Sequence, residues 1–158
     1  MSGQIGSGPG LTRRGVLTCV GAVTAGAVLE GCAFLRGGAS HPQYALAPSQ
    51  QHGATLRLPV KQMTFPADGV VLVEPEGGYP KLLVRRVPDG TYEVVTANCT
   101  HLGCVVGWDP SGRRWSCPCH GSAFATDGKV LHGPANKPLG TPPSRLEGDE
   151  LVIEMTPG

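Results

Sequence analysis

Short apolar runs rich in Val, Leu and Ile recur along the chain from residue 54 onward, and turn-forming residues separate them. Runs of about four to eight such residues between Gly, Pro and Asp signals are typical of strands, whereas a helix needs a longer run with a period of about 3.6. The expected strands cover residues 55–60, 70–74, 81–87, 92–97, 105–108, 113–116 and 151–155.

The turn signals between these runs indicate how the strands connect. Residues 88–90 read Pro-Asp-Gly and separate two runs, residues 109–112 read Asp-Pro-Ser-Gly, and residues 148–149 read Gly-Asp before the last run. Tight turns of this composition join antiparallel neighbours, so the second one predicts a hairpin. The pattern therefore predicts a small antiparallel β domain in stacked sheets over residues 54–158.

The N-terminal part follows a different pattern. Arg13 and Arg14 stand directly before an uncharged run over residues 15–29, an order that resembles a twin-arginine export signal. We expect a helical leader over residues 1–35. Export by this path moves folded proteins, and it would place the β domain on the periplasmic or outer face of a bacterial cytoplasmic membrane.

The fate of this leader stays open. As a helix, residues 15–29 would span about 22 Å, short of a hydrocarbon core of about 30 Å, and extension to Leu35 reaches about 31 Å but includes Glu30. Residues 29–32 also resemble a lipoprotein cleavage box, with Cys32 as the lipid-modified residue. An uncleaved anchor, a lipid on Cys32 and a fully cleaved leader are the three alternatives.

Residues 36–53 have no hydrophobic period and are expected to form a flexible linker. The expected organisation is thus a signal or anchor over residues 1–35, a linker over residues 36–53, and one β domain over residues 54–158. We assign no role to His41 and His52 within this linker.

Composition agrees with an all-β domain and excludes one class of partner. The chain has 158 residues with 24 Gly, 15 Pro and 5% aromatic residues, which suits a turn-rich β fold better than a helical bundle. Its formal net charge of +1, without a basic stripe, gives no reason to expect nucleic-acid binding.

The candidate chemistry lies between residues 99 and 122. Four of the six cysteines fall in this stretch, in the segments Cys-Thr-His-Leu-Gly-Cys (99–104) and Cys-Pro-Cys-His-Gly-Ser (117–122). Each segment offers Cys and His side chains from one loop, so two loops could clamp one metal centre. Such donors suit an iron–sulfur or a zinc centre, although zinc modules more often use a Cys-x-x-Cys spacing.

The pattern Cys99-x-His101, fifteen residues, Cys117-x-x-His120 resembles that of Rieske [2Fe-2S] proteins of cytochrome bc1/b6f-type complexes. The resemblance implies a β-sandwich with two cluster-binding loops at its tip. It further implies that Cys99 and Cys117 bind one iron while His101 and His120 bind the other. Neutral imidazole ligands raise the potential of such a cluster above that of all-Cys ferredoxins.

Further residues extend the resemblance beyond the ligands. Cys104 and Cys119 occupy the positions of a disulfide in respiratory Rieske proteins, and Pro134 lies in a Gly-Pro-Ala segment like the family's loop over the cluster. Ser122 matches a serine whose hydroxyl tunes the cluster. Phe124 stands where the family has a tuning tyrosine, so we expect a lower potential than in ubiquinol-type relatives, matched to menaquinol.

The resemblance implies electron transfer from quinol to a c-type cytochrome, in a complex with a cytochrome b-type subunit. His120 would contact the quinol and couple proton release to electron transfer, with His101 as the second His ligand. Two alternatives are the small Rieske subunit of an exported molybdenum oxidoreductase of the arsenite oxidase kind and, more remotely, a structural zinc module.

Overall fold

The computed structural model describes residues 42–157, which form twelve strands and no helix. The strands are β1 Ala45–Leu46, β2 Gln50–His52, β3 Thr55–Leu58, β4 Val70–Val73, β5 Leu82–Arg86, β6 Tyr92–Thr96, β7 Gly107–Asp109, β8 Arg114–Ser116, β9 Ala123–Phe124, β10 Val130–His132, β11 Ser144–Glu147 and β12 Glu150–Glu154. Within the described residues no helix is long and apolar enough to span a membrane.

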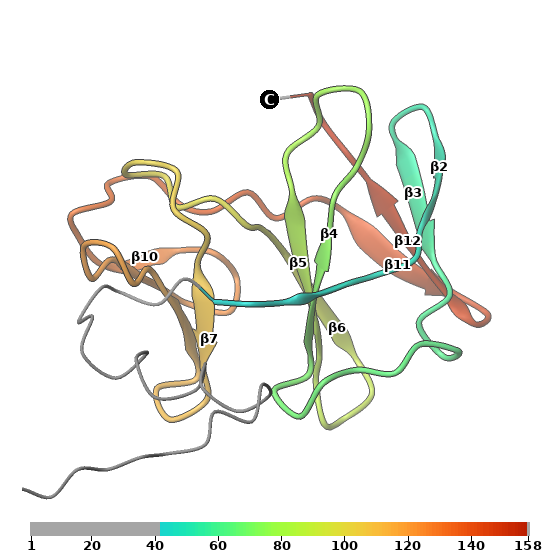
Figure 1. Ribbon diagram of the computed structural model, residues 1–158, viewed down its shortest axis with the longest axis horizontal. Coiled ribbons are helices and arrows are strands. Elements are labelled where there is room, and N and C mark those ends of the chain that lie inside the picture. Colours follow the sequence, from blue (N-terminus) through green and yellow to red (C-terminus); the bar gives the residue numbers. More distant parts are fainter. Residues whose placement is uncertain (1–41, 158) are drawn as a thin grey trace, which may run out of the picture. The chain divides into compact units, whose positions relative to one another are not determined.

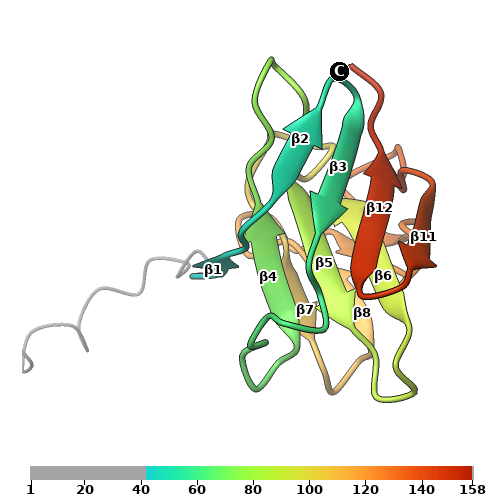
Figure 2. The ribbon, with the colours of Figure 1, turned by 90° about the vertical axis from the view of Figure 1, so that its right-hand side faces the viewer.

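The strands form three four-stranded sheets. We call them the central sheet (β1-β4-β5-β6), the loop sheet (β10-β9-β8-β7) and the outer sheet (β11-β12-β3-β2). Figure 1 shows the central sheet between the other two, and Figure 2 shows the outer sheet face-on in front of it. All pairings are antiparallel except that of β1 with β4.

The central sheet is buried on both faces, which explains the continuous apolar runs in its strands. One face packs with the outer sheet into a core that includes Leu56, Val84 and Ile153. The other face packs with the loop sheet into a second core that includes Leu83 and Trp115. Four consecutive residues of β5 are buried for this reason, because alternate side chains enter opposite cores.

The predicted all-β class is confirmed, and every expected strand from residue 55 onward forms over at least part of its range. The expected hairpin over residues 105–116 forms as β7 and β8, and Asp109 closes its turn by accepting bonds from the amides of Ser111 and Gly112. Five short strands have no counterpart in the predicted pattern: β1, β2, β9, β10 and β11. The first two fall in the expected linker range, while the expected leader lies outside the described residues.

Residues 42–47 form a strap that joins two of the sheets, visible as the cyan segment crossing Figure 1. The Tyr44 hydroxyl donates to the Val106 carbonyl and accepts from the Trp108 amide, both at 3.1 Å, beside the loop sheet. Further along, the strap adds β1 to the edge of the central sheet. Burial raises the pKa of Tyr44 to about 12, despite the opposing effect of the bond from Trp108.

Candidate metal centre

Two loops at one end of the loop sheet follow the same backbone path, one before β7 and one after β8. In each loop the amide of the first cysteine donates to the carbonyl five residues later, and the amide of a glycine four residues later donates back to that cysteine. These bonds, of 2.7–3.0 Å, join Cys99 to Cys104 and Gly103, and Cys117 to Ser122 and Gly121. Both glycines have φ of +78°, which only glycine adopts readily.

The predicted ligands come together with the thiols below and the imidazoles above. Cys99 and Cys117 are free thiols, each only 3% exposed, whereas His101 and His120 are exposed. The two imidazole rings contact each other edge to face, with centroids 4.9 Å apart and planes nearly perpendicular. A centre held by these residues would have its thiolate side in the protein and its imidazole side at the surface.

The predicted disulfide between Cys104 and Cys119 is present and ties the two loops together. The sulfur of Cys117 lies with theirs, all three within 4.8 Å of one another. These three cysteines are not a metal site, because the sulfurs of a disulfide are not available as thiolate ligands. Burial raises the pKa of the Cys117 thiol, and the neighbouring Cys99 thiol raises it further, although backbone amides oppose the shift.

The Ser122 hydroxyl links the second loop to residues 133–140, the segment that carries Pro134. Ser122 is fully buried, and its oxygen accepts a bond of 3.0 Å from the Ala135 amide, so its own proton remains free for another acceptor. Pro134 itself is exposed, next to the buried Ala135. Phe124 is fully buried in β9, and its side chain carries no hydroxyl.

Sequence reasoning missed a second link to the same segment. The Thr100 hydroxyl, between two predicted ligands, donates to the Lys137 carbonyl at 2.6 Å. The segment thus bonds to both ligand loops independently of the disulfide. No pattern in the sequence predicts this hydrogen bond, because its partners are 37 residues apart and the acceptor is a backbone carbonyl.

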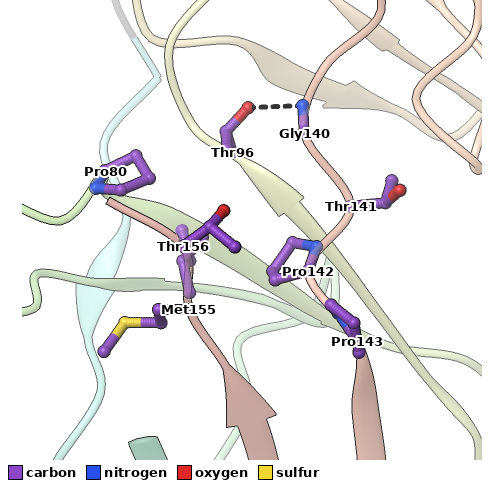
Figure 3. A pocket seen from close by; sticks show the side chains of 9 residues that line it. Pro80, Thr96, Gly140, Thr141, Pro142, Pro143, Met155 and Thr156 are labelled. Carbon is purple, nitrogen blue, oxygen red and sulfur yellow. Dashed lines mark hydrogen bonds between the residues drawn. The ribbon is translucent and has the colours of Figure 1, made fainter. Parts of the chain in front are cut away.

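The far end of this segment is fixed to β6. The Thr96 hydroxyl accepts from the Gly140 amide at 2.9 Å, as Figure 3 shows, and the Gly140 carbonyl accepts from the Thr96 amide. A cleft of about 140 Å³ opens beside this contact, between Pro80 and Pro142. Its lining includes none of the predicted site residues, so the candidate chemistry lies at the two loops and not in this cleft.

The four ligand side chains fit a [2Fe-2S] cluster in chemistry and placement. Two buried thiols and two surface imidazoles come in like pairs, one of each from each loop, as required when one iron takes two Cys and the other two His. The same donors would also satisfy zinc. The donor set thus suits both an iron–sulfur cluster and zinc, and the comparison with known proteins separates these two candidates.

The Rieske [2Fe-2S] domain family matches residues 58–143, more than half of the chain. Cytochrome b6-f complex iron-sulfur subunit 3 of Nostoc sp. is 33% identical over 83% of this chain and 78% of its own length. Subunit 2 of that complex from Trichormus variabilis is 41% identical over 61% of this chain and 55% of its own length.

A solved structure supports the fold. The ferredoxin of carbazole 1,9a-dioxygenase from Nocardioides aromaticivorans superposes with a TM-score of 0.50 over 75% of this chain and all of its own, at 15% identity. At that identity the likeness concerns the fold alone. The sequence relatives decide in favour of iron and sulfide over zinc at the two loops.

Proposed function

Because this chain belongs to the Rieske [2Fe-2S] protein family and so carries a Rieske-type cluster for electron transfer, we propose that it takes electrons from quinol and passes them to a c-type cytochrome. The observation that carries the proposal is the pair of exposed imidazoles, His101 and His120, above two buried thiols. An electron donor in solution or in a membrane complex can reach the imidazoles without any rearrangement of the core.

In this proposal Cys99 and Cys117 hold the inner iron and the two histidines hold the outer one. The cluster, when bound, accepts and returns one electron at a potential raised by its neutral ligands. The protein positions the ligands through four backbone bonds within the loops and one disulfide between them. Burial of the thiols keeps water away from the inner side.

His120 has the second role of holding a proton. If one ring nitrogen of His120 bound iron, the other would remain available to accept a hydrogen bond from a quinol hydroxyl and then to take the proton. Its exposure leaves that nitrogen open to substrate and to solvent. Leu102, 68% exposed beside His101, gives the same tip an apolar surface suited to an apolar quinol or to the subunit that binds it.

The partner we propose is a cytochrome b-containing complex. The relatives reported above are subunits of cytochrome b6-f complexes, and this supports such an assembly over a molybdenum oxidoreductase. The absence of a hydroxyl on Phe124 favours a lower potential than that of ubiquinol-type relatives and hence menaquinol as donor.

The place of action we propose is the periplasmic or outer face of a bacterial cytoplasmic membrane. Arg13 and Arg14 before the uncharged run support export by the twin-arginine path, with the chain held by its leader or by a lipid on Cys32. An oxidising compartment also suits the disulfide between Cys104 and Cys119.

The test is to purify the tagged full chain from detergent-solubilised membranes of its source organism. We expect b-type haem to co-purify and the EPR spectrum of the reduced cluster to change when a quinol-site inhibitor is added. Co-purification of molybdenum without b-type haem would contradict the proposal and support the alternative subunit role. A spectrum indifferent to the inhibitor would count against quinol as donor.

A further inference from the structure

The indole N–H of Trp115 is the one buried side-chain nitrogen or oxygen among residues 42–157 that lacks a hydrogen-bond partner. The residue itself is 0% exposed. A buried N–H that leaves water without gaining an acceptor destabilises the folded state, and native structures contain few such groups. This atom therefore points to an acceptor that does not belong to the described part of the chain.

Trp115 occupies the middle of an aromatic row on the loop sheet. It pairs in register with Trp108 on β7 and with Phe124 on β9, so the three side chains stand side by side on one face. The ring centroids of the two tryptophans are 5.1 Å apart, and the Arg85 guanidinium lies 3.9 Å above the Trp108 ring. Neighbours on both sides thus hold the indole in place.

The aromatic row lies in the same buried core as the two ligand thiols. Trp115 lies in β8, and Cys117 directly follows the end of that strand. Together with Cys99 and Phe124 they belong to one buried group of packed apolar residues. In this core the sulfurs of a bound cluster are acceptors that the binding itself introduces.

We propose that Trp115 tunes the cluster, its indole Nε1–H donating a hydrogen bond to a sulfide of the cluster, since neither ligand thiol accepts from it. The inference rests on the proposed ligand set. A donor to sulfur favours the reduced, more negative state and raises the potential. Phe124 has no hydroxyl that could donate to the cluster. Trp115, on the neighbouring strand, would replace part of that missing increase in potential.

An isotope experiment tests the bond directly. The chain has two tryptophans, so the Trp108→Phe variant leaves Trp115 as the sole indole. We would label this full-length variant with indole-¹⁵N tryptophan, reduce the cluster and record pulsed-EPR hyperfine spectra in H₂O and D₂O. The expected result is a ¹⁵N coupling together with an exchangeable proton coupling. An intact cluster signal with no ¹⁵N coupling would overturn the inference while leaving the ligand assignment unaffected.

A potentiometric series gives a second readout. Trp115→Phe keeps an aromatic ring but removes the N–H, and we expect a lower midpoint potential. Trp108→Phe is the matched control, because it keeps both an aromatic ring beside Trp115 and the Trp115 N–H, and it should leave the potential unchanged. Adding Phe124→Tyr to Trp115→Phe should raise the potential again. An unchanged potential in Trp115→Phe would refute the proposal. If that variant fails to hold a cluster, the labelled Trp108→Phe protein still decides.

Discussion

Removal of the disulfide between Cys104 and Cys119 should weaken the hold of the two loops on the cluster without abolishing it. The bond closes a loop with a sequence separation of 15. Loss of that constraint costs about 3 kcal/mol by the chain-entropy estimate. Since about 1.4 kcal/mol corresponds to a factor of ten, loop opening should become about 10²-fold more frequent.

The contacts that remain without the disulfide should still allow the cluster to be inserted. Each loop keeps its own two backbone bonds, and the Thr100 and Ser122 contacts still join both loops to residues 135–137. The Cys104→Ser, Cys119→Ser double variant should therefore show the ordinary EPR signal. It should lose its cluster up to about 10²-fold faster than the parent protein, an upper limit set by the entropy estimate.

The assay is the loss of visible circular dichroism in buffer containing an iron chelator, without denaturant. Leu58→Ala is the matched control, because a buried Leu→Ala change costs about 2–5 kcal/mol but this residue lies in the core between the central and outer sheets. It should lower thermal stability and leave the rate of cluster loss in buffer near that of the parent. Equal rates in the double variant and the parent, or faster loss in Leu58→Ala, would refute the reasoning.

Three further predictions concern single side chains. Phe124→Tyr should raise the midpoint potential by about 40 mV, if the new hydroxyl bond to sulfur contributes about 1 kcal/mol and 59 mV corresponds to tenfold for one electron; an unchanged potential in redox-titrated EPR would contradict this. Thr100→Val, but not Thr100→Ser, should speed cluster loss in the dichroism assay by about fivefold, because only the serine keeps a donor for the Lys137 carbonyl. Burial raises the pKa of Tyr44 to about 12 in the folded state, above its unfolded value near 10. The neutral form of Tyr44 therefore stabilises the fold fully below about pH 10, and this contribution is lost as the pH rises towards 12. Urea unfolding at about pH 9 and about pH 11 should show a steeper loss for the parent than for Tyr44→Phe, and equal losses would exclude Tyr44 as the cause.

The strands predicted from the sequence are those whose own residues carry the signal. Residues 82–86 and 92–96 are β-branched or Leu-rich and lie between turn signals, so local pattern and tertiary burial agree. Strand β11 escaped prediction because all four of its residues are exposed and only its pairing with β12 makes it a strand. Strand β1 has two residues, and its partner β4 comes more than twenty positions later.

The candidate site likewise has features that the sequence predicts and features that only the structure reveals. The predicted ligands and the disulfide partners lie in two compact motifs, and the resemblance of these motifs to those of Rieske proteins predicted both the ligand set and the disulfide, which the structure contains. The links from Thr100 to Lys137 and from Ala135 to Ser122 depend on how the chain closes after β10, which no local pattern encodes. The unpaired indole of Trp115 becomes visible only when burial and hydrogen bonds are known.

The central claim is that two buried thiols and two exposed imidazoles hold one [2Fe-2S] cluster. Redox-titrated EPR of the purified full chain, labelled with ¹⁵N-histidine, tests it most directly. The account predicts a rhombic signal on reduction, with an average g value below that of the free electron and couplings to two histidine nitrogens. The single variants His101→Cys and His120→Cys should each lose one of these two couplings. A reduced, iron-containing protein without histidine nitrogen couplings would contradict it.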